Sequence, residues 1–140
     1  MSGDLKIFSN VRLTTPGVYR EIVAAGTSIR IDILRDGRPP HGYCFHHLQD
    51  RALLADALSY ARRTQSQTLR FIGKITLASG AEIEVGACFG KIAIRWHLPR
   101  EAGADVKRAT FLQGTELEAL EKAYAHVLGV IEAREARIAS

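Results

Sequence analysis

The sequence predicts an α+β protein with two antiparallel four-stranded β-sheets, each followed by a helix (β4α–β4α). Three observations predict this class. Apolar residues alternate with polar ones over short stretches and then recur at helical spacing, and this change of period occurs twice along the chain. The alternating stretches are joined by links of hairpin length, which favours antiparallel pairing. The 140 residues are the size of one ordinary domain, so we expect a single domain over 1–140.

The first half contains four predicted strands. Three turns with Gly or Pro separate these four strands, at 14–17, around Gly26 and at 36–40. The strands are predicted over 5–13, 18–25, 28–35 and 41–47. In the first strand, alternation predicts an inward set and an outward set: Leu5, Ile7, Val11 and Leu13 inward, and Lys6, Phe8, Asn10 and Arg12 outward. In the third strand, Ile29, Ile31 and Ile33 are predicted to lie opposite Arg30 and Asp32.

The period then changes from two residues to about 3.6. Leu54, Ala57, Leu58 and Ala61 recur at helical spacing and predict a helix over about 49–65. One face of this helix is therefore expected to be buried and the other to be exposed to solvent.

The second half repeats the same order. Its strands are predicted over 68–78, 81–88, 91–98 and 106–112. A second helix is predicted from the N-cap residue Thr115 to about residue 136, because acidic residues follow in its first turn. The inward set in these strands is predicted to include Leu69, Phe71, Ile75, Ile83, Val85, Ile92, Ile94 and Trp96. The outward set is predicted to include Arg70, Ile72, Lys74, Glu82, Glu84, Lys91, Arg95 and His97.

The two halves, 5–65 and 68–136, resemble each other in more than element order. The alternating segment 29–33 corresponds to 92–96, and each is followed by a polar loop, a phenylalanine and a helix with an acid near its start. Two amphipathic helices can also match by chance, so an internal repeat is a hypothesis. Two β4α units would cover each other's apolar surfaces if they paired about a pseudo-twofold axis.

Basic residues are concentrated in the part of the chain predicted to form strands. The formal net charge is +4, but the segment 115–140 carries five acidic and three basic residues, so the first 114 residues carry +6. Fourteen of the 19 basic residues are Arg, whose planar fork suits phosphate. A GC-rich bacterial genome would produce the same bias. The charge therefore permits an anionic partner without requiring one.

The motifs of common enzyme classes do not occur in the sequence. It has neither a Gly-rich phosphate-binding motif nor a G-x-S-x-G nucleophile motif, so we expect no enzyme activity and no cofactor. Cys44 and Cys88 are too few for a disulfide scaffold. His41, Cys44, His46 and His47 cluster, but neighbouring strand residues point to opposite faces, so we expect no metal site.

The sequence shows no signal for export or membrane insertion. The N-terminus lacks the basic and apolar regions of a signal peptide, and no run reaches about 18 apolar residues. We therefore expect a cytoplasmic protein with no membrane partner.

A resemblance to a known family rests on the segment from 90 to 116. This segment contains Gly90-Lys91, the strand 92–97, a polar loop with the basic pair Lys107-Arg108, then Phe111-Leu112 and Thr115-Glu116. Its order is similar to that of the positive cofactor four coactivators, and the β4α–β4α chain resembles the Whirly proteins of plants. The resemblance implies a Whirly-like fold and a protein that binds single-stranded DNA or RNA.

Single-strand binding needs basic side chains along the phosphates and aromatic rings for stacking on bases. The predicted outward faces supply nine candidates: Lys6, Phe8, Arg12, Arg30, Arg70, Lys74, Lys91, Arg95 and His97. Asp32, Glu82 and Glu84 share these faces and weaken the basic character. We therefore expect a non-catalytic regulator of transcription or DNA metabolism, with Phe8 as the candidate stacking residue.

The alternative is a protein–protein interaction module, such as a secretion chaperone, an immunity protein or a phage or plasmid regulator. The same antiparallel sheets would then act through an edge or a helix face. The second helix places Tyr124, Val127 and Ile131 beside acidic residues, which makes it a candidate dimer surface in a homo-oligomer.

Overall fold

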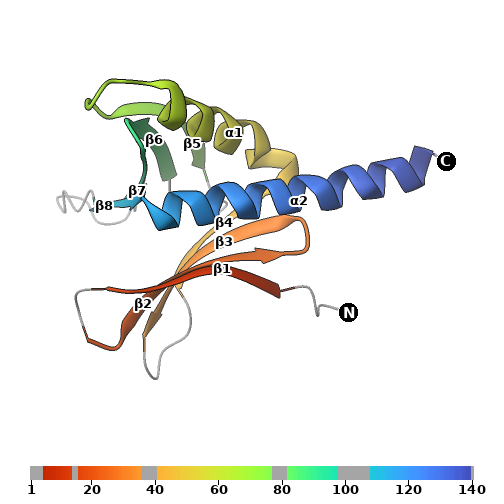
Figure 1. Ribbon diagram of the computed structural model, residues 1–140, viewed down its shortest axis with the longest axis horizontal. Coiled ribbons are helices and arrows are strands. Elements are labelled where there is room, and N and C mark those ends of the chain that lie inside the picture. The colour runs from red at the N-terminus through yellow and green to blue at the C-terminus, as the bar shows by residue number, and fades with distance from the viewer. Residues whose placement is uncertain (1–4, 14–15, 36–40, 77–81, 98–107, 140) are drawn as a thin grey trace. The chain divides into compact units, whose positions relative to one another are not determined.

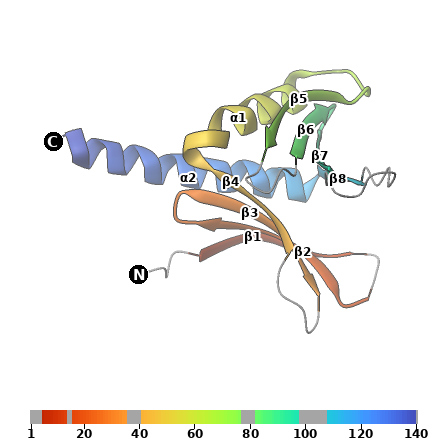
Figure 2. The same cartoon turned by 180° about the vertical axis from the view of Figure 1, so that it is seen from behind.

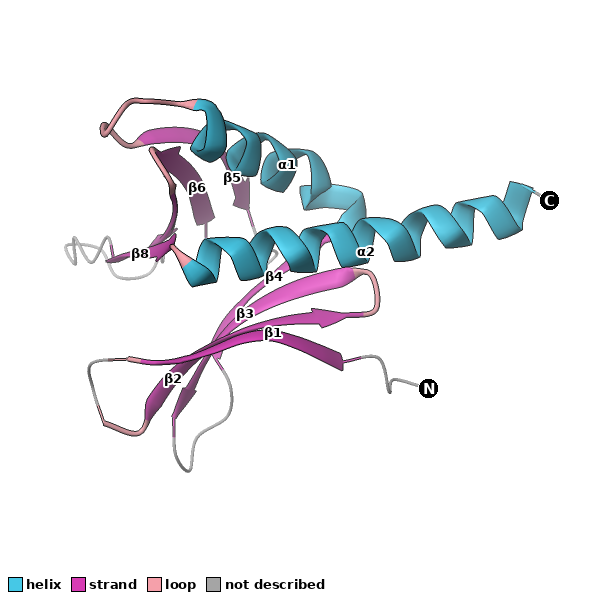
Figure 3. Cartoon of the chain, in the orientation of Figure 1, coloured by secondary structure: helices cyan, strands magenta, loops and turns pink. Residues whose placement is uncertain are grey.

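The computed structural model describes residues 5–13, 16–35, 41–76, 82–97 and 108–139 (Figures 1 and 3). The elements in chain order are β1 (Leu5–Arg12), β2 (Val18–Ala25), β3 (Ser28–Arg35), β4 (His41–His46), α1 (His47–Arg63), β5 (Arg70–Thr76), β6 (Glu82–Cys88), β7 (Lys91–His97), β8 (Arg108–Gln113) and α2 (Thr115–Ala139). The predicted α+β class, with antiparallel sheets and two helices, is confirmed.

The chain divides into two compact units that do not follow its two halves. One unit comprises Met1–Gln49 with Glu118–Ser140, and the other comprises Asp50–Leu117. The first unit thus combines β1–β4 with most of α2, and the second combines most of α1 with β5–β8. Each helix is therefore grouped with the sheet of the other half, and not with the sheet that precedes it.

The first sheet has the strand order β1-β2-β3-β4, and every neighbouring pair is antiparallel. Ile22 of β2 pairs with Ile31 of β3, and Ala24 pairs with Ile29. All four side chains are buried, so this side of the sheet forms the core of the first unit. The helix α2 runs along the sheet in both views (Figures 1 and 2). Its buried stripe has the expected helical spacing and includes Leu120, Ala123, Val127 and Ile131.

The second sheet has the order β5-β6-β7-β8 and is also antiparallel. One of its sides contacts α1, because a Cβ atom built on Gly73 would lie 2.8 Å from Cδ1 of Leu53. The backbone N–H of Gly90, at the β6–β7 turn, donates a 2.9 Å hydrogen bond to the carbonyl of Ala61. These contacts position α1 against the second sheet, and its side facing α1 includes the buried residues Ile83, Val85, Ala87, Ile92, Ile94 and Leu112.

A β-bulge in β1 overturns the predicted faces at the start of that strand. The register shifts between Ile7 and Ser9, so Phe8 is the extra residue. Leu5 and Ile7, predicted to face inward, are 57% and 59% exposed. Phe8, predicted to face outward, is half-buried, and its ring centroid lies 5.7 Å from that of His126 on α2. One extra residue reverses the faces before the bulge relative to those after it.

A second bulge overturns the faces of β5 in the same way. The register shifts between Phe71 and Gly73. Arg70, predicted to face outward, pairs with the buried Ala87 and lies over the ring of Tyr60 on α1, at 5.6 Å. Phe71, predicted to face inward, pairs with Gly86 and lies on the opposite side of the sheet. The prediction for Lys74 holds, because that residue comes after the bulge.

The helices begin and end close to the predicted positions. The first begins two residues earlier than predicted and ends at Arg63, where the N–H of Ser66 donates to the hydroxyl of Thr64 instead of continuing the helix. The second begins at Thr115, as predicted, and extends to Ala139, three residues beyond the predicted end. Within the described ranges, neither helix is both long and apolar enough to cross a membrane.

Candidate nucleic-acid interface on the second sheet

The side of the second sheet that faces away from α1 carries the candidate site. We call it the outer face. Residues paired across antiparallel strands lie on the same side of a sheet, so the register defines its members. Its first row is Phe71, Gly86, Ala93 and Phe111, and its second row is Lys74, Glu84, Arg95 and Ala109. Glu82 and Lys91 lie on the same side, farther along β6 and β7.

Arg95 lies at the centre of the outer face and makes two kinds of contact. Its Nη2 and Nε donate to Oε1 of Glu84 at 2.9 and 3.2 Å. Its guanidinium carbon lies 4.0 Å from the ring centroid of Phe71, well within cation–π range. The side chains of Arg95 and Glu84 are 24% and 23% exposed. Arg95 is thus held in one orientation by a carboxylate and a ring together.

The ring of Phe71 occupies its place because residue 86 is glycine. A Cβ atom built on Gly86 would lie 3.1 Å from Cδ1 of Phe71 and 3.0 Å from the backbone oxygen of Arg70. A glycine within a strand marks such a close approach. The next residue in the row is Ala93, which is also small. At the far end of the row, on the edge strand β8, Phe111 is 41% exposed.

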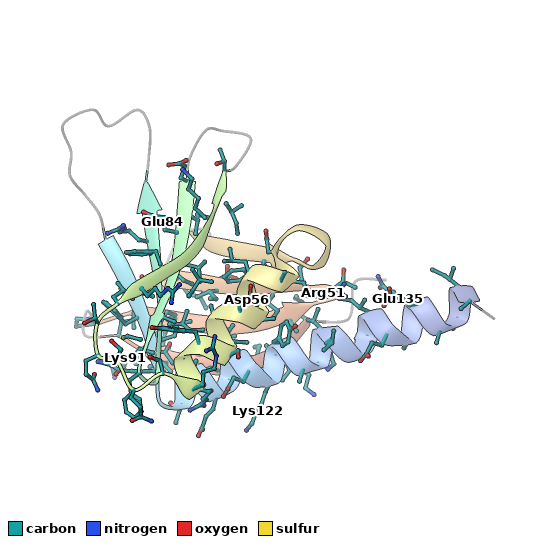
Figure 4. The ribbon with its side chains drawn as sticks, turned by 90° about the horizontal axis from the view of Figure 1, so that it is seen from above. Arg51, Asp56, Glu84, Lys91, Lys122 and Glu135 are labelled. Carbon is teal, nitrogen blue, oxygen red and sulfur yellow. The ribbon has the colours of Figure 1, made fainter. Side chains whose placement is uncertain are left out.

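A second ion pair lies nearer the edge of the outer face. Lys74 Nζ donates to Oε2 of Glu82 at 3.1 Å, and these side chains are 60% and 37% exposed. Such an exposed pair contributes little to stability. The ammonium group of Lys74 lies at the surface in this pair, where an anion can reach it. Figure 4 shows Glu84 and Lys91 on this sheet, with Lys91 nearer the β6–β7 turn.

The nine predicted site residues are divided between the two units. Lys6, Phe8, Arg12 and Arg30 belong to the first unit, and Arg70, Lys74, Lys91, Arg95 and His97 belong to the second. The outer face brings together Lys74, Lys91 and Arg95. The backbone of His97 pairs with that of Glu82, but its side chain lies outside the described residues.

Three of the nine residues lie on the wrong side of their sheet for the predicted outward role. Phe8 contacts α2, and Lys6 pairs with the buried Ala24, with its Nζ 5.3 Å from the Phe8 ring. Arg70 lies over Tyr60 of α1. All three residues precede a bulge or form it. The sequence prediction assumed regular alternation without the extra residue, and it therefore placed them on the opposite side of the sheet.

Among the residues that the structure describes, the corresponding side of the first sheet carries two basic side chains, Arg12 and Arg30, where the outer face carries three. Arg12 is exposed there. Arg30 Nε lies 3.2 Å from Oδ2 of Asp32, whose side chain is only 9% exposed. Asn10 donates a 2.9 Å hydrogen bond to Glu21. Two acidic residues therefore lie among the basic ones of this face.

Sequence reasoning missed Phe71 and Phe111, two aromatic residues that the structure describes on the outer face. The signal for Phe71 was present in Gly73 and Gly86, because glycines inside predicted strands often mark a bulge or a close approach. The signal for Phe111 was its position one residue before Leu112. Leu112 is fully buried, so its neighbour faces the other side.

The histidine-rich cluster lies in β4 and at the first residue of α1. The side chains of His41, Cys44, His46 and His47 lie outside the described residues. Among the side chains that the structure describes, no group of three or more His, Cys, Asp or Glu residues is arranged to hold a metal ion.

Comparison with known proteins identifies no family for this chain. No protein-family model matches the chain, and no curated protein matches its sequence. What the outer face can do must therefore be inferred from its own side chains.

Proposed function

We propose that this protein binds single-stranded DNA or RNA through the outer face of the second sheet. The observation that carries the proposal is the cation–π pair of Arg95 and Phe71, which lies in the same face as the exposed Phe111. Proteins that bind single strands combine cations that contact phosphates with aromatic rings on which bases stack. Both kinds of group are present here on neighbouring strands.

The residues of the outer face suggest how such a ligand would bind. Phe111, and Phe71 with Arg95 over its ring, would offer stacking surfaces, while Lys74 and Lys91 would contact phosphates. Gly86 and Ala93 lie between the two rings in the row and have no polar side-chain atoms. With no donor or acceptor there to read base edges, we expect little sequence preference.

A Whirly-like arrangement with a pseudo-twofold axis, as implied by the resemblance, is part of the proposal. The positions of the two bulges support an internal duplication. Each bulge lies in the first strand of its sheet, and its partners in the second strand are Val23 and Ile22 in one case and Gly86 and Val85 in the other. In this proposal the protein is a non-catalytic cytoplasmic regulator of transcription or DNA metabolism.

Binding can be tested by fluorescence anisotropy at low salt with labelled oligothymidylate and oligouridylate of about 20 nucleotides, longer than the sites of small single-strand-binding domains. We expect binding that weakens as salt is added, because neutralised phosphates release counterions. Replacing Phe71 or Phe111 by Ala should each weaken binding about tenfold, through lost stacking. Ile7→Ala, at the position in the first sheet that corresponds to Phe71, is the matched control and should bind normally. Absence of binding by the natural sequence would overturn the proposal.

One observation favours the alternative, an interaction module for proteins. Leu5 and Ile7 are large apolar residues, both more than half exposed, on β1 at the edge of the first sheet. Exposed apolar edge strands are suited to pairing with another chain, including a second copy of this one. Purified protein with no absorbance from nucleic acid and a stoichiometric protein partner in a pull-down would support this function. Loss of that partner in the Ile7→Lys variant would locate it at β1.

A further inference from the structure

We infer that Glu84 is an internal competitor for nucleic acid: it occupies Arg95 in the free protein, and a phosphate of the ligand replaces it on binding. This inference rests on the proposed function and adds a regulatory contact to it. It is built from the outer-face residues Phe71, Lys74, Glu82, Glu84 and Arg95.

The first step of the argument is the match between carboxylate and phosphate. Two nitrogen atoms of the Arg95 guanidinium donate to Oε1 of Glu84, at 2.9 and 3.2 Å. The guanidinium fork binds carboxylate and phosphate oxygens with similar geometry. A phosphate that approaches Arg95 must therefore compete with Glu84 for N–H groups that are already engaged.

The second step concerns what remains when Glu84 is displaced. The contact with the Phe71 ring places the guanidinium carbon of Arg95 4.0 Å from the ring centroid, whereas the contacts with Glu84 are made by Nε and Nη2. Loss of the carboxylate contact therefore need not move the guanidinium off the ring. The cation would stay oriented for the phosphate, and little additional ordering would be required on binding.

The third step is that the register places Glu84 between two cations. It lies directly opposite Arg95 on β7 and directly opposite Lys74 on β5. Lys74 forms its hydrogen bond with Glu82 instead, in a pair that is more exposed than the Glu84–Arg95 pair. Among the described side chains, the outer face thus contains two carboxylate–cation pairs of the same charge, and the pair with Glu84 engages the arginine that lies over the Phe71 ring.

These two pairs provide a matched experiment. Glu84→Gln and Glu82→Gln remove the same charge from the same face and change the side-chain shape little. We expect Glu84→Gln to tighten binding of labelled oligothymidylate about tenfold at low salt, the size of effect of one charge-assisted hydrogen-bonded pair. Glu82→Gln should tighten binding by about twofold or less, as expected of a solvent-exposed pair.

A double-mutant cycle locates the effect at Arg95. In an Arg95→Ala background, Glu84→Gln should tighten binding no more than Glu82→Gln does, because no guanidinium is left to release and only the general effect of the lost charge remains. Thermal unfolding followed by circular dichroism should show that each variant is folded at the temperature of the binding assay. Chemical shifts of the Arg95 side chain, measured by NMR, should move on addition of oligonucleotide more in the natural sequence than in Glu84→Gln.

The outcomes separate the inference from the function on which it rests. If the natural sequence and both Gln variants fail to bind, the proposed function and the inference are both wrong. If the natural sequence binds and the two Gln variants tighten binding equally, only net charge matters and the inference alone is wrong. If Glu84→Gln weakens binding, Glu84 positions Arg95 for the ligand and does not compete with it.

Discussion

The two sheets have the same strand order and a bulge at corresponding positions, but their outer sides differ in chemistry. In the first sheet, the row beside the bulge contains Ile7, Val23 and Arg30. The corresponding row in the second sheet contains Phe71, Gly86 and Ala93. Replacing a valine by a glycine creates room for an aromatic ring to lie against the strand. The backbone thus provides two equivalent platforms, and the side chains make only one of them aromatic.

The neighbouring rows differ in charge as well. Asn10, Glu21 and Asp32 lie side by side in the first sheet. The corresponding positions of the second sheet hold Lys74, Glu84 and Arg95. One row has two acidic residues and no basic one, and the other has two basic residues and one acidic. A polyanion would therefore distinguish between two sheets that share a strand order and a bulge position.

The largest expected effect comes from making the second sheet resemble the first at Arg95. Arg95→Asp places the residue found at the corresponding position of β3, Asp32, on the outer face. We expect affinity for labelled oligothymidylate to fall about a hundredfold, because a phosphate contact and a cation–π pair are lost together and a repulsive charge is added. Anisotropy titration at low salt measures this.

Arg12→Asp is the matched control for this change. It changes the net charge of the protein by the same amount, at an exposed arginine of the first sheet. Its effect should be about threefold or less, because it acts only at long range. Equal losses in the two variants would mean that the second sheet has no special role.

A smaller effect is expected when the glycine of the aromatic row is replaced by its counterpart in the first sheet. Gly86→Val adds a Cβ atom 3.1 Å from the Phe71 ring and 3.0 Å from a backbone oxygen, with further methyl groups beyond it. We expect the free energy of unfolding in urea to fall by about 1–3 kcal/mol, as is typical of overpacking.

The contrast for this prediction is Gly129 on α2, where a Cβ atom would meet nothing within 4 Å. Gly129→Ala should raise the free energy of unfolding, by up to about 1 kcal/mol, through helix propensity. A Gly86→Val protein as stable as the natural one would show that the ring of Phe71 is not constrained by the strand beneath it.

The smallest effect is expected at the exposed ion pair of the second sheet. Lys74→Ala breaks the contact with Glu82 and should change the free energy of unfolding by less than about 0.5 kcal/mol, since exposed pairs contribute little. It should also weaken oligonucleotide binding about threefold and make it less sensitive to salt, because one phosphate contact is lost. A Lys74 variant with an unchanged salt dependence of binding would place the phosphates elsewhere.

Much of the secondary structure follows from the sequence because it depends on local periods. Alternation of isoleucines with polar residues predicts β3 and β7, and both 29–31 and 92–94 include buried isoleucines on one side. The apolar stripe that contains Leu54 and Ala61 predicts α1 to within two residues at each end. Lys74, Lys91 and Arg95 were predicted on the correct face for the same reason.

Only the tertiary structure decides which side of a strand is the outer one when a bulge intervenes. An extra residue at Phe8 or Ile72 reverses the faces of the residues before it. Whether that residue is accommodated depends on its pairing partner on another strand. The alternation of apolar and polar residues within one strand does not identify that partner. For this reason Phe8, Arg70 and Phe71 were assigned to the wrong sides.

The sequence by itself determined the order of strands and helices, the apolar positions within them and the concentration of positive charge outside the last helix. The tertiary structure decided that each helix is grouped with the sheet of the other half, and that Phe71, Arg95 and Phe111 lie on one face. The physical reason is the distance along the sequence over which each feature is set. Periods of two and 3.6 residues reflect the geometry of a single element, whereas the outer face depends on registers between strands that are distant in sequence.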